Sequence, residues 1–200
     1  MSLLFETIRL QDGVLQNIYY HNLRLNYSRE SLYKSTDVID LEKIIQIPSN
    51  FRHGLYKCRV TYGKKEVKTV EFEPYLPHII KSLRLIEDDR ISYEHKYTNR
   101  GSLNQLLTKR ERFDEIIIVK KGYITDTSYS NIIFFDGIKW VTPSAPLLRG
   151  TMRSFLIDSK LISEMEIKVT DMKLFKKARL INAMNPIESG KDIKIEKIGY

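Results

Sequence analysis

A lysine in a polar connector is the first residue of this sequence that could form a covalent bond to a ligand. Lys96 stands in the stretch EHKYTNR, between a segment with strand character and one with helix character. His95 and Arg100 flank it, and nearby like charges lower the pKa of an amine, which favours the neutral nucleophile of Schiff-base chemistry. The alternative interpretation is a solvated surface lysine, because the chain holds 33 lysines and arginines.

The stretch TDTSYSN, residues 125–131, places polar side chains between two apolar runs. We expect the flanking runs, DEIIIVKKGYI and IIFF, to form a hairpin pair, for which two or three turn residues would suffice. Four hydrogen-bonding side chains instead fall within six residues, namely Asp126, Ser128, Ser130 and Asn131. The pattern predicts a concave polar ligand site backed by a sheet, although Asp126 could equally accept backbone hydrogen bonds in a turn.

The stretch PSAPLLRGTMRSFLI indicates a loop that leads into a helix. Gly150 precedes Thr151 and Met152 where the helix would begin, and the unpaired N–H groups and dipole of a helix N-terminus favour an anion. The alternative is a plain turn at Gly150 with Thr151 as the helix cap.

The elements that must position these residues differ on the two sides of Pro74 and Pro77, which mark the best linker candidate. Before them, period-two alternation in LLFETIRLQDG predicts a strand with Phe5, Thr7 and Arg9 on one face, followed by a turn. Two helices are predicted next, in HNLRLNYSRESLY and in DLEKIIQI, and two strands follow around residue 63.

The first of these predicted helices takes its apolar face from Leu23, Tyr27 and Leu32, and the second begins at Asp40. Beyond the prolines, the sequence predicts a strand-rich region with two or three helices. Its expected elements are a strand in KSLRLIE, a helix in SLNQLLTKRERF, the quoted hairpin pair, a helix in MRSFLIDSKLI and a last alternating segment, EIKVTDMKLFKKARLINAMNPI.

Composition narrows the class of protein. The 200 residues are 42% hydrophobic, enough to bury a core, and Cys58 is the single cysteine, which excludes a disulfide framework and a cysteine-cluster metal site. Four histidines without HxxH or HExxH spacing argue against zinc, so no metal site is predicted. The net charge of +8 is scattered among acids along the whole chain, which disfavours nucleic acid as a partner.

Neither a membrane-spanning run of about 20 apolar residues nor a signal peptide is visible, so we expect a cytoplasmic protein. The basic charge favours a small anionic ligand over a membrane partner.

Taken in order, the motifs resemble the class IV aminotransferase family, the fold-type IV enzymes that use pyridoxal 5'-phosphate. Seven stretches match in the family's order over nearly the whole chain: LFETIRLQDG, HNLRLNYS, HKYTNRGSLNQ, FDEIIIVKKGYITDTSYSNIIFF, WVTP, LLRGTMRSFLI and LINAMNPI. The resemblance implies an α+β fold of two lobes. A small α/β domain would span residues 1–74, and a strand-rich pseudo-barrel carrying the Schiff-base lysine would span residues 79–200.

The resemblance also implies roles for individual residues. Lys96 matches the lysine that binds the cofactor covalently and then transfers protons, and Arg24 matches the arginine that binds the cofactor phosphate. Gly150, Thr151 and Met152 match the loop that completes the phosphate site, with Ser130 and Asn131 beside it.

Two departures from the family pattern stand out. Asp126 lies where the family usually has Glu, opposite the pyridine nitrogen, and its side chain is shorter by one methylene. Family members usually carry a further strand and loop before the FET segment, so we expect part of the small lobe to be missing here.

Within the family, the details KYTNR, GTMR and NAMNPI are most similar to those of enzymes with 4-amino-4-deoxychorismate lyase activity, which yields 4-aminobenzoate and pyruvate. Thr7 is then the expected proton donor, and the substrate-binding residues are expected to be Arg9, Arg59, Arg100 and Asn182. A branched-chain or D-amino-acid aminotransferase on the same scaffold, and a non-catalytic homologue that binds a phosphate-bearing ligand, remain alternatives. The resemblance also implies a homodimer.

Overall fold

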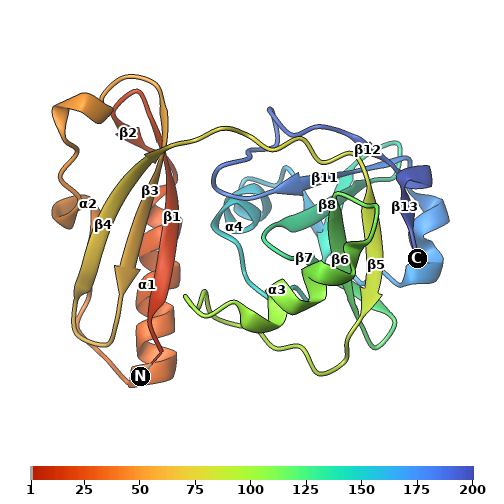
Figure 1. Ribbon diagram of the computed structural model, residues 1–200, viewed down its shortest axis with the longest axis horizontal. Coiled ribbons are helices and arrows are strands. Elements are labelled where there is room, and N and C mark those ends of the chain that lie inside the picture. Colours follow the sequence, from red (N-terminus) through yellow and green to blue (C-terminus); the bar gives the residue numbers. More distant parts are fainter. Residues whose placement is uncertain (1) are drawn as a thin grey trace. The chain divides into compact units, whose positions relative to one another are not determined.

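Three β-sheets with helices beside them make up the computed structural model of the chain, which describes residues 2–200 (Figure 1). The chain divides into two units. The first holds the residues up to Pro77 together with His95–Asn99, and the second holds His78–Glu94 and Arg100–Tyr200. The segment that carries Lys96 thus groups with the first unit.

The first unit is a four-stranded antiparallel sheet in the order β2-β1-β3-β4, packed against one helix. Strands β1 and β2 are joined at Asp12 and Gly13, whose φ angles of 48° and 80° are those of a tight type I′ hairpin turn. The elements are β1 (Leu4–Gln11), β2 (Val14–Leu15), α1 (Ile18–Tyr33), α2 (Leu41–Ile44), β3 (Leu55–Tyr62) and β4 (Val67–Pro74).

The core of this unit lies between the sheet and α1, where Leu4, Ile8 and Leu10 of β1 are fully buried. Burial of an aliphatic side chain contributes roughly 1.5–3 kcal/mol, so these alternate positions of β1 fix its register and its inward face. Phe5, Thr7 and Arg9 must then point to the opposite face of the sheet, as the alternation predicted.

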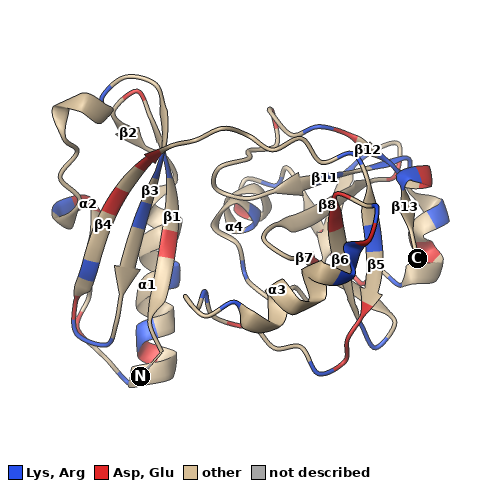
Figure 2. Ribbon diagram, viewed as in Figure 1, with Lys and Arg blue, Asp and Glu red and all other residues tan. Residues whose placement is uncertain are grey.

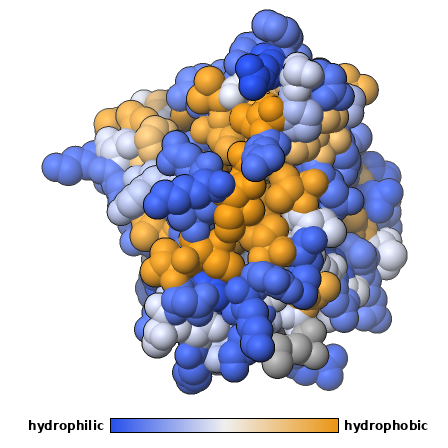
Figure 3. Space-filling view, turned by 90° about the vertical axis from the view of Figure 1, so that its left-hand side faces the viewer, coloured by the Kyte–Doolittle hydropathy of each residue, from blue (hydrophilic) through white to orange (hydrophobic). Residues whose placement is uncertain are grey.

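The face that α1 buries differs from the predicted one. Leu23 and Tyr27 are exposed by 50% and 61%, whereas the buried face carries mostly polar side chains. The prediction was wrong because each buried polar residue of this helix has a hydrogen-bond or ionic partner inside the unit, so hydrophobicity does not mark its inner face. The buried residues are His21, Leu25, Ser28 and Arg29. Figure 3 shows a band of apolar side chains left at the surface on the side that carries this unit.

The second unit contains two sheets, one in the order β13-β5-β6-β7 and one in the order β10-β9-β8-β11-β12. Its strands are β5 (Leu83–Glu87), β6 (Glu115–Lys120), β7 (Tyr123–Thr127), β8 (Asn131–Phe135), β9 (Trp140–Pro143), β10 (Ser163–Met165), β11 (Lys177–Ile181), β12 (Ile193–Lys194) and β13 (Ile198–Gly199). Its helices are α3 (Gly101–Leu107) and α4 (Thr151–Asp158). Ile117, Ile132 and Phe134 belong to one buried apolar cluster that joins strands of both sheets.

The expected pairing of the runs on either side of TDTSYSN was wrong. Strand β7 pairs with β6, and β8 pairs with β9 and β11, so residues 128–130 cross from one sheet to the other. The crossing is fixed by Thr127, whose N–H donates to the Ser130 carbonyl at 2.9 Å and whose hydroxyl accepts from the Ser130 N–H at 3.0 Å. Polar side chains are needed here because the buried chain reversal leaves backbone groups that a ladder would otherwise pair.

Several elements are shorter than predicted. The second predicted helix covers only Leu41–Ile44 before Pro48, and the third ends at Leu107, after which the chain forms a 3-10 turn over Thr108–Arg110. The last alternating segment forms a strand only at Lys177–Ile181. Figure 2 shows basic and acidic residues interleaved in both units. None of the helices within residues 2–200 combines the length and apolarity that crossing a lipid bilayer requires.

Candidate active site

In the first unit, Lys96 lies beside the first strand of the sheet. The Phe5 N–H donates to the Lys96 carbonyl at 3.0 Å, and Leu4 and Tyr97 form an antiparallel bridge. These backbone contacts attach residues 95–99 to the N-terminal end of β1. They explain why Lys96, far along the sequence, belongs to the unit of the FET segment.

The aromatic ring of Phe5 brings two of the predicted site residues together. The Lys96 Nζ atom lies 4.7 Å from the centre of the ring, and the Arg59 guanidinium carbon lies 4.1 Å from it. A cation over an aromatic face is attracted by the ring's negative electrostatic potential, typically by ~0.5–2 kcal/mol. Phe5 therefore restrains both side chains on one face of the sheet.

Thr7 and Arg9 lie on the same face of the sheet as Phe5. Thr7 is the register partner of Arg59, and Arg9 is the partner of Lys57, and side chains of directly paired residues point to one face. The Arg9 guanidinium donates to the Gln11 side chain at 3.2 Å. The structure thus gathers Lys96, Thr7 and Arg59 on one surface of the first unit and places Arg9 along it.

On the opposite, inner face of β1, Glu6 holds Arg24 and His21. Both Glu6 and His21 are fully buried, and Arg24 is 11% exposed. The Arg24 Nε atom donates to Glu6 Oε1 at 2.9 Å, and its Nη2 donates to Glu6 Oε2. Glu6 Oε2 also lies 2.6 Å from His21 Nδ1. The two-pronged contact fixes the plane of the Arg24 guanidinium.

The charges in this network follow from its burial. Burial alone would raise the pKa of Glu6, but the charge of Arg24 and the hydrogen bond from His21 lower it to about 2. Burial lowers the pKa of His21 and outweighs the raising effect of Glu6. Glu6 is therefore ionised and His21 neutral at pH 7, and because a carboxylate only accepts, His21 carries its proton on Nδ1.

His95 connects the lysine segment to α1. Its Nδ1 atom lies 3.1 Å from the Ser28 hydroxyl, and its Nε2 lies 3.4 Å from the Ser31 hydroxyl. The imidazole is 6% exposed. The ring is thus held against the helix by hydroxyl groups, which anchors the residue directly before Lys96.

In the second unit, a register irregularity in β7 aims Asp126 into the protein. Ile117 pairs with Thr127 and Val119 pairs with Ile124, so β7 has one residue more than β6 between these pairs. An extra residue of this kind bends the strand and redirects side chains, and such bulges are frequent beside active sites. All residues from Ile124 to Thr127 are buried, so Asp126 lies within the protein.

Asp126 accepts its hydrogen bonds from neutral groups, two of which are short. The Asn131 Nδ2 atom donates to Asp126 Oδ1 at 2.7 Å, and the Leu148 N–H donates to Asp126 Oδ2 at 2.9 Å. Burial raises the pKa of Asp126 to about 6, against the lowering effect of these two hydrogen bonds and of the charge of Arg153. A buried carboxylate in this state is well suited to a cationic ligand group, which would restore its ionised form.

The other polar residues of the crossing are held mainly by the protein. The Ser128 hydroxyl donates to Glu115 at 2.9 Å, and Arg100 donates to the Ser128 carbonyl at 2.6 Å. The Asn182 amide donates to the Ser130 hydroxyl at 2.7 Å. These contacts give Ser130, Arg100 and Asn182 structural partners, and their roles as ligand-binding residues stay predictions.

Glu115 is the buried carboxylate that anchors this loop. It is 3% exposed, and burial raises its pKa against the lowering effect of hydrogen bonds from Ile116 and Ser128. Its donors are the N–H of the adjacent Ile116 and, from the crossing, the N–H and hydroxyl of Ser128.

Gly150 lies where the loop enters α4, as predicted, and approaches Asn131 closely. A Cβ atom at residue 150 would stand 1.9 Å from Asn131 Oδ1, a separation no side chain tolerates. Thr151 and Met152, the first residues of α4, are 3% and 4% exposed. Glycine is required here by the neighbour and not by the backbone, whose φ of −70° suits any residue.

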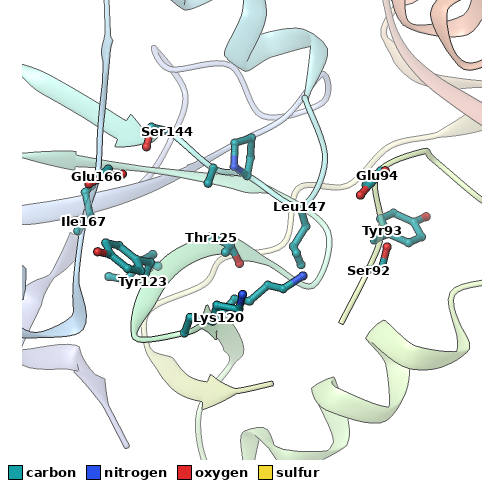
Figure 4. A pocket seen from close by; sticks show the side chains of 14 residues that line it. Ser92, Tyr93, Glu94, Lys120, Tyr123, Thr125, Ser144, Leu147, Glu166 and Ile167 are labelled. Carbon is teal, nitrogen blue, oxygen red and sulfur yellow. The ribbon is translucent and has the colours of Figure 1, made fainter. Parts of the chain in front are cut away.

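The second unit also contains a cavity of roughly 350 Å³ (Figure 4). Lys120, Tyr123 and Thr125 line it from the β6–β7 hairpin, and Ser144 and Leu147 line it from the segment after β9. None of the predicted site residues lines this cavity, although Thr125 and Leu147 are chain neighbours of Asp126 and Leu148.

Sequence reasoning missed Glu6, His21 and Glu115. Glu6 was part of the matching stretch LFETIRLQDG, and it stands on the apolar face of an alternating strand, where a charged residue signals a buried partner. His21 precedes Arg24 by three residues and so lies on the same face of the helix, which could have indicated a shared partner. Nothing local marks Glu115, because its partner Ser128 follows it by 13 residues and depends on the crossing.

Known proteins resemble the chain over nearly its whole length. It is 36% identical over 184 residues to a protein of Haemophilus influenzae named only as uncharacterized, covering 91% of this chain and 97% of that one. A crystal structure from Haemophilus somnus 129PT, described as a "putative 4-amino-4-deoxychorismate lyase", has a TM-score of 0.88 at 36% identity and covers 94% of this chain and 98% of its own.

A hypothetical aminotransferase from Mycobacterium tuberculosis, in its pyridoxal-phosphate-bound form, has a TM-score of 0.74 at 16% identity. The match covers 96% of this chain and 80% of that one, and it shows the fold alone. A sequence profile of the family described as Amino-transferase class IV matches residues 3–191. The chain is therefore a member of the class IV aminotransferase family, which is a family of enzymes.

Proposed function

We propose that the protein is a pyridoxal-phosphate-dependent 4-amino-4-deoxychorismate lyase, which releases 4-aminobenzoate and pyruvate and so serves folate synthesis. The observation that carries this choice within the family is the match, over 94% of the chain at 36% identity, to the structure described by that activity. The motifs KYTNR, GTMR and NAMNPI support the same choice.

The second unit fits the ring of the cofactor. Asp126 is buried, its two hydrogen-bond donors are neutral, and its pKa is raised to about 6. A protonated pyridine nitrogen would supply the cation that such a carboxylate lacks, and the ion pair would hold the proton on the ring. The shorter Asp suits this role because the bulge in β7 sets the position of its carboxylate.

Arg24 is the expected phosphate-binding residue of the first unit, and the segment from Gly150 to Met152 is the expected one of the second unit. Arg24 offers a guanidinium whose plane Glu6 fixes, and guanidinium groups recognise phosphate oxygens with high geometric specificity. Gly150, Thr151 and Met152 form the N-terminus of α4, where backbone N–H donors favour an anion. Asn131 would hold this loop in place through its hydrogen bonds to Asp126 and to the Leu148 carbonyl.

The remaining residues would carry the reaction. When bound, pyridoxal phosphate supplies an electron-withdrawing ring that takes up the electron pair released as a substrate C–H bond breaks. Lys96 would hold the cofactor through Nζ, and its free amine would accept the proton from the substrate carbon that bears nitrogen. The Thr7 hydroxyl donates a proton to the departing enolpyruvyl group, which leaves as pyruvate.

Arg59 and Arg9 would bind the carboxylates of the anionic amino substrate. Both point to the same face of the sheet as Thr7, and Arg59 shares the Phe5 ring with Lys96. Arg100 and Asn182 are the residues of the second unit expected to bind substrate, and both lie beside the 128–130 crossing. We further propose that the protein acts as a cytoplasmic homodimer.

The test is product formation from aminodeoxychorismate without an added keto acid. We expect equal amounts of 4-aminobenzoate and pyruvate, and loss of both, together with the yellow colour of the bound cofactor, in Lys96→Ala. Lys68→Ala, on the exposed side of β4, serves as the matched control. Activity retained in Lys96→Ala would rule out the proposed chemistry.

An aminotransferase acting on branched-chain or D-amino acids is the second candidate, since the matching family is that of the class IV aminotransferases. The two activities share Lys96 and Asp126, so only the acceptor separates them. Turnover that depends on 2-oxoglutarate, with no pyruvate formed from aminodeoxychorismate, would select the aminotransferase.

A further inference from the structure

One amide side chain joins the carboxylate of β7 to the loop that leads into α4. The Asn131 Nδ2 atom donates to Asp126 Oδ1 at 2.7 Å and to the Leu148 carbonyl at 2.9 Å. The Leu148 N–H donates in turn to Asp126 Oδ2 at 2.9 Å. The three residues thus form a closed ring of hydrogen bonds in which Asp126 only accepts.

The other end of the same amide fixes the next part of the loop. Asn131 Oδ1 occupies the space that a Cβ atom of residue 150 would need, at 1.9 Å. The backbone at Gly150, with φ −70° and ψ 143°, would accept an alanine without strain. The position of Gly150 is therefore set by contact with Asn131. A rotation of the amide would alter both its hydrogen bond to Asp126 and its contact with Gly150.

We propose that Asn131 is a positioning residue that couples the charge of Asp126 to the position of the 148–150 segment. In this role it does not bind the phosphate itself. The inference rests on the proposed function only in naming what the two ends hold, the ring nitrogen at Asp126 and the phosphate at Gly150.

The direction of the coupling follows from the donors. An ionised Asp126 accepts from Asn131 and Leu148 together, whereas a protonated carboxyl must turn a hydrogen toward one of these two donors or away from both. Arg153 is the further charged group that acts on Asp126, and it is itself paired with Glu164 at 2.5 Å. An ionised Asp126 therefore holds the 148–150 segment in place through its hydrogen bonds to Asn131 and Leu148.

The test uses the protein without cofactor and follows two quantities. The first is the pKa of Asp126, measured by carboxyl-carbon NMR and assigned with Asp126→Asn. The second is the dissociation constant of inorganic phosphate. Two variants disturb the amide: Asn131→Leu, with the same number of side-chain heavy atoms, removes its hydrogen bonds, and Gly150→Ala displaces it by the added Cβ.

We expect both variants to raise the pKa of Asp126 by roughly one unit, because a hydrogen bond to the charged form is lost. Phosphate affinity should fall roughly fivefold in each. Gly63→Ala is the matched control, since a Cβ there meets only the Leu3 side chain at 3.5 Å, and it should change neither quantity.

The result at Gly150 decides the question. If Gly150→Ala weakens phosphate binding but leaves the pKa of Asp126 at its wild-type value, the two ends are independent and the coupling is refuted. Should Asn131→Leu fail to fold, Gly150→Ala alone still gives this answer. Neither measurement involves the lyase reaction, so a protein that proved to be an aminotransferase would leave the inference standing.

Discussion

The Nε atom of Arg24 donates to Oε1 of Glu6 at 2.9 Å, across the interface between helix α1 and strand β1. Glu6 is fully buried and its pKa is lowered to about 2, from an ordinary value of 4.5, so the pair is ionised at neutral pH. Glu6 therefore orients a residue expected to bind phosphate and also stabilises the first unit.

Glu6→Gln should lower the free energy of unfolding at pH 7 by about 3 kcal/mol, because a buried arginine loses its counter-charge. A lowered carboxyl pKa contributes stability that is present above pH 4.5 and is lost as the pH falls toward 2. Urea unfolding at several pH values should show the difference from wild type narrowing in that window. Glu30→Gln, on the exposed surface of α1, should behave as wild type; a pH-independent difference would contradict this account.

Asp126→Asn should stabilise the cofactor-free protein at pH 8. The pKa of Asp126 rises from 3.8 to about 6 on folding, so the folded state binds more protons and wild-type stability falls as the pH rises through this range. The shift corresponds to at most about 3 kcal/mol, and an imperfectly bonded asparagine would recover part of it.

Thermal unfolding of Asp126→Asn at pH 4 and pH 8 measures this gain, which should be present only at the higher pH. Added pyridoxal phosphate should raise the melting temperature of wild type more than that of the variant, because the variant lacks the anion for the ring nitrogen. Equal cofactor-induced shifts would argue that Asp126 does not face the ring.

Arg59→Gln should raise KM for aminodeoxychorismate with little change in kcat. Arg59 stacks on Phe5 and lies on the face that carries Thr7, which suits a residue that binds substrate carboxylate in the ground state and the transition state alike. Steady-state kinetics should show a KM increase of roughly tenfold, for a lost charge-assisted hydrogen bond. Lys57→Gln, two register pairs further along the same strands and paired with Glu73, is the control. A fall in kcat alone would instead assign Arg59 to the chemical step.

Arg29→Met should destabilise the protein without altering the chemistry. The Arg29 side chain is fully buried and donates to the Lys64 carbonyl at 2.9 Å and to Asp37 Oδ2 at 2.6 Å. Its removal takes these donors away from the Lys64 carbonyl, which costs about 1–3 kcal/mol, whereas the Asp37 side chain is 67% exposed and can be hydrated. Chemical unfolding should register the loss, while Arg52→Met, at an exposed site, should unfold like wild type. A kcat reduced in the folded variant would contradict a purely structural role.

Some of the fold follows from short-range pattern. The alternation in LFETIRLQ requires a strand with Thr7 and Arg9 facing away from the core, and the Asp12-Gly13 pair requires a tight turn. These features depend on neighbours in the chain, for which the period of a strand and the φ freedom of glycine are sufficient reasons. The motifs around Lys96 and Gly150 likewise pointed to the family without a structure.

The inner face of α1 is the clearest feature that pattern could not give. Its buried His21 and Arg29 are stable only because Glu6 and Asp37 meet them from other elements, and no local periodicity of hydrophobicity reports such pairs. The burial cost of a charge is offset by a partner whose position is set by the tertiary fold.

By itself, the sequence of this protein determined its family, its strands and turns, and the residue types of its site. Only the tertiary structure decided that TDTSYSN crosses between sheets, that a bulge in β7 turns Asp126 inward, and that Asn131 bonds to Asp126 and Leu148. The physical reason is range: alternation and turn chemistry act between adjacent residues, whereas the register of a sheet and the partners of a buried polar group depend on segments far apart in the chain.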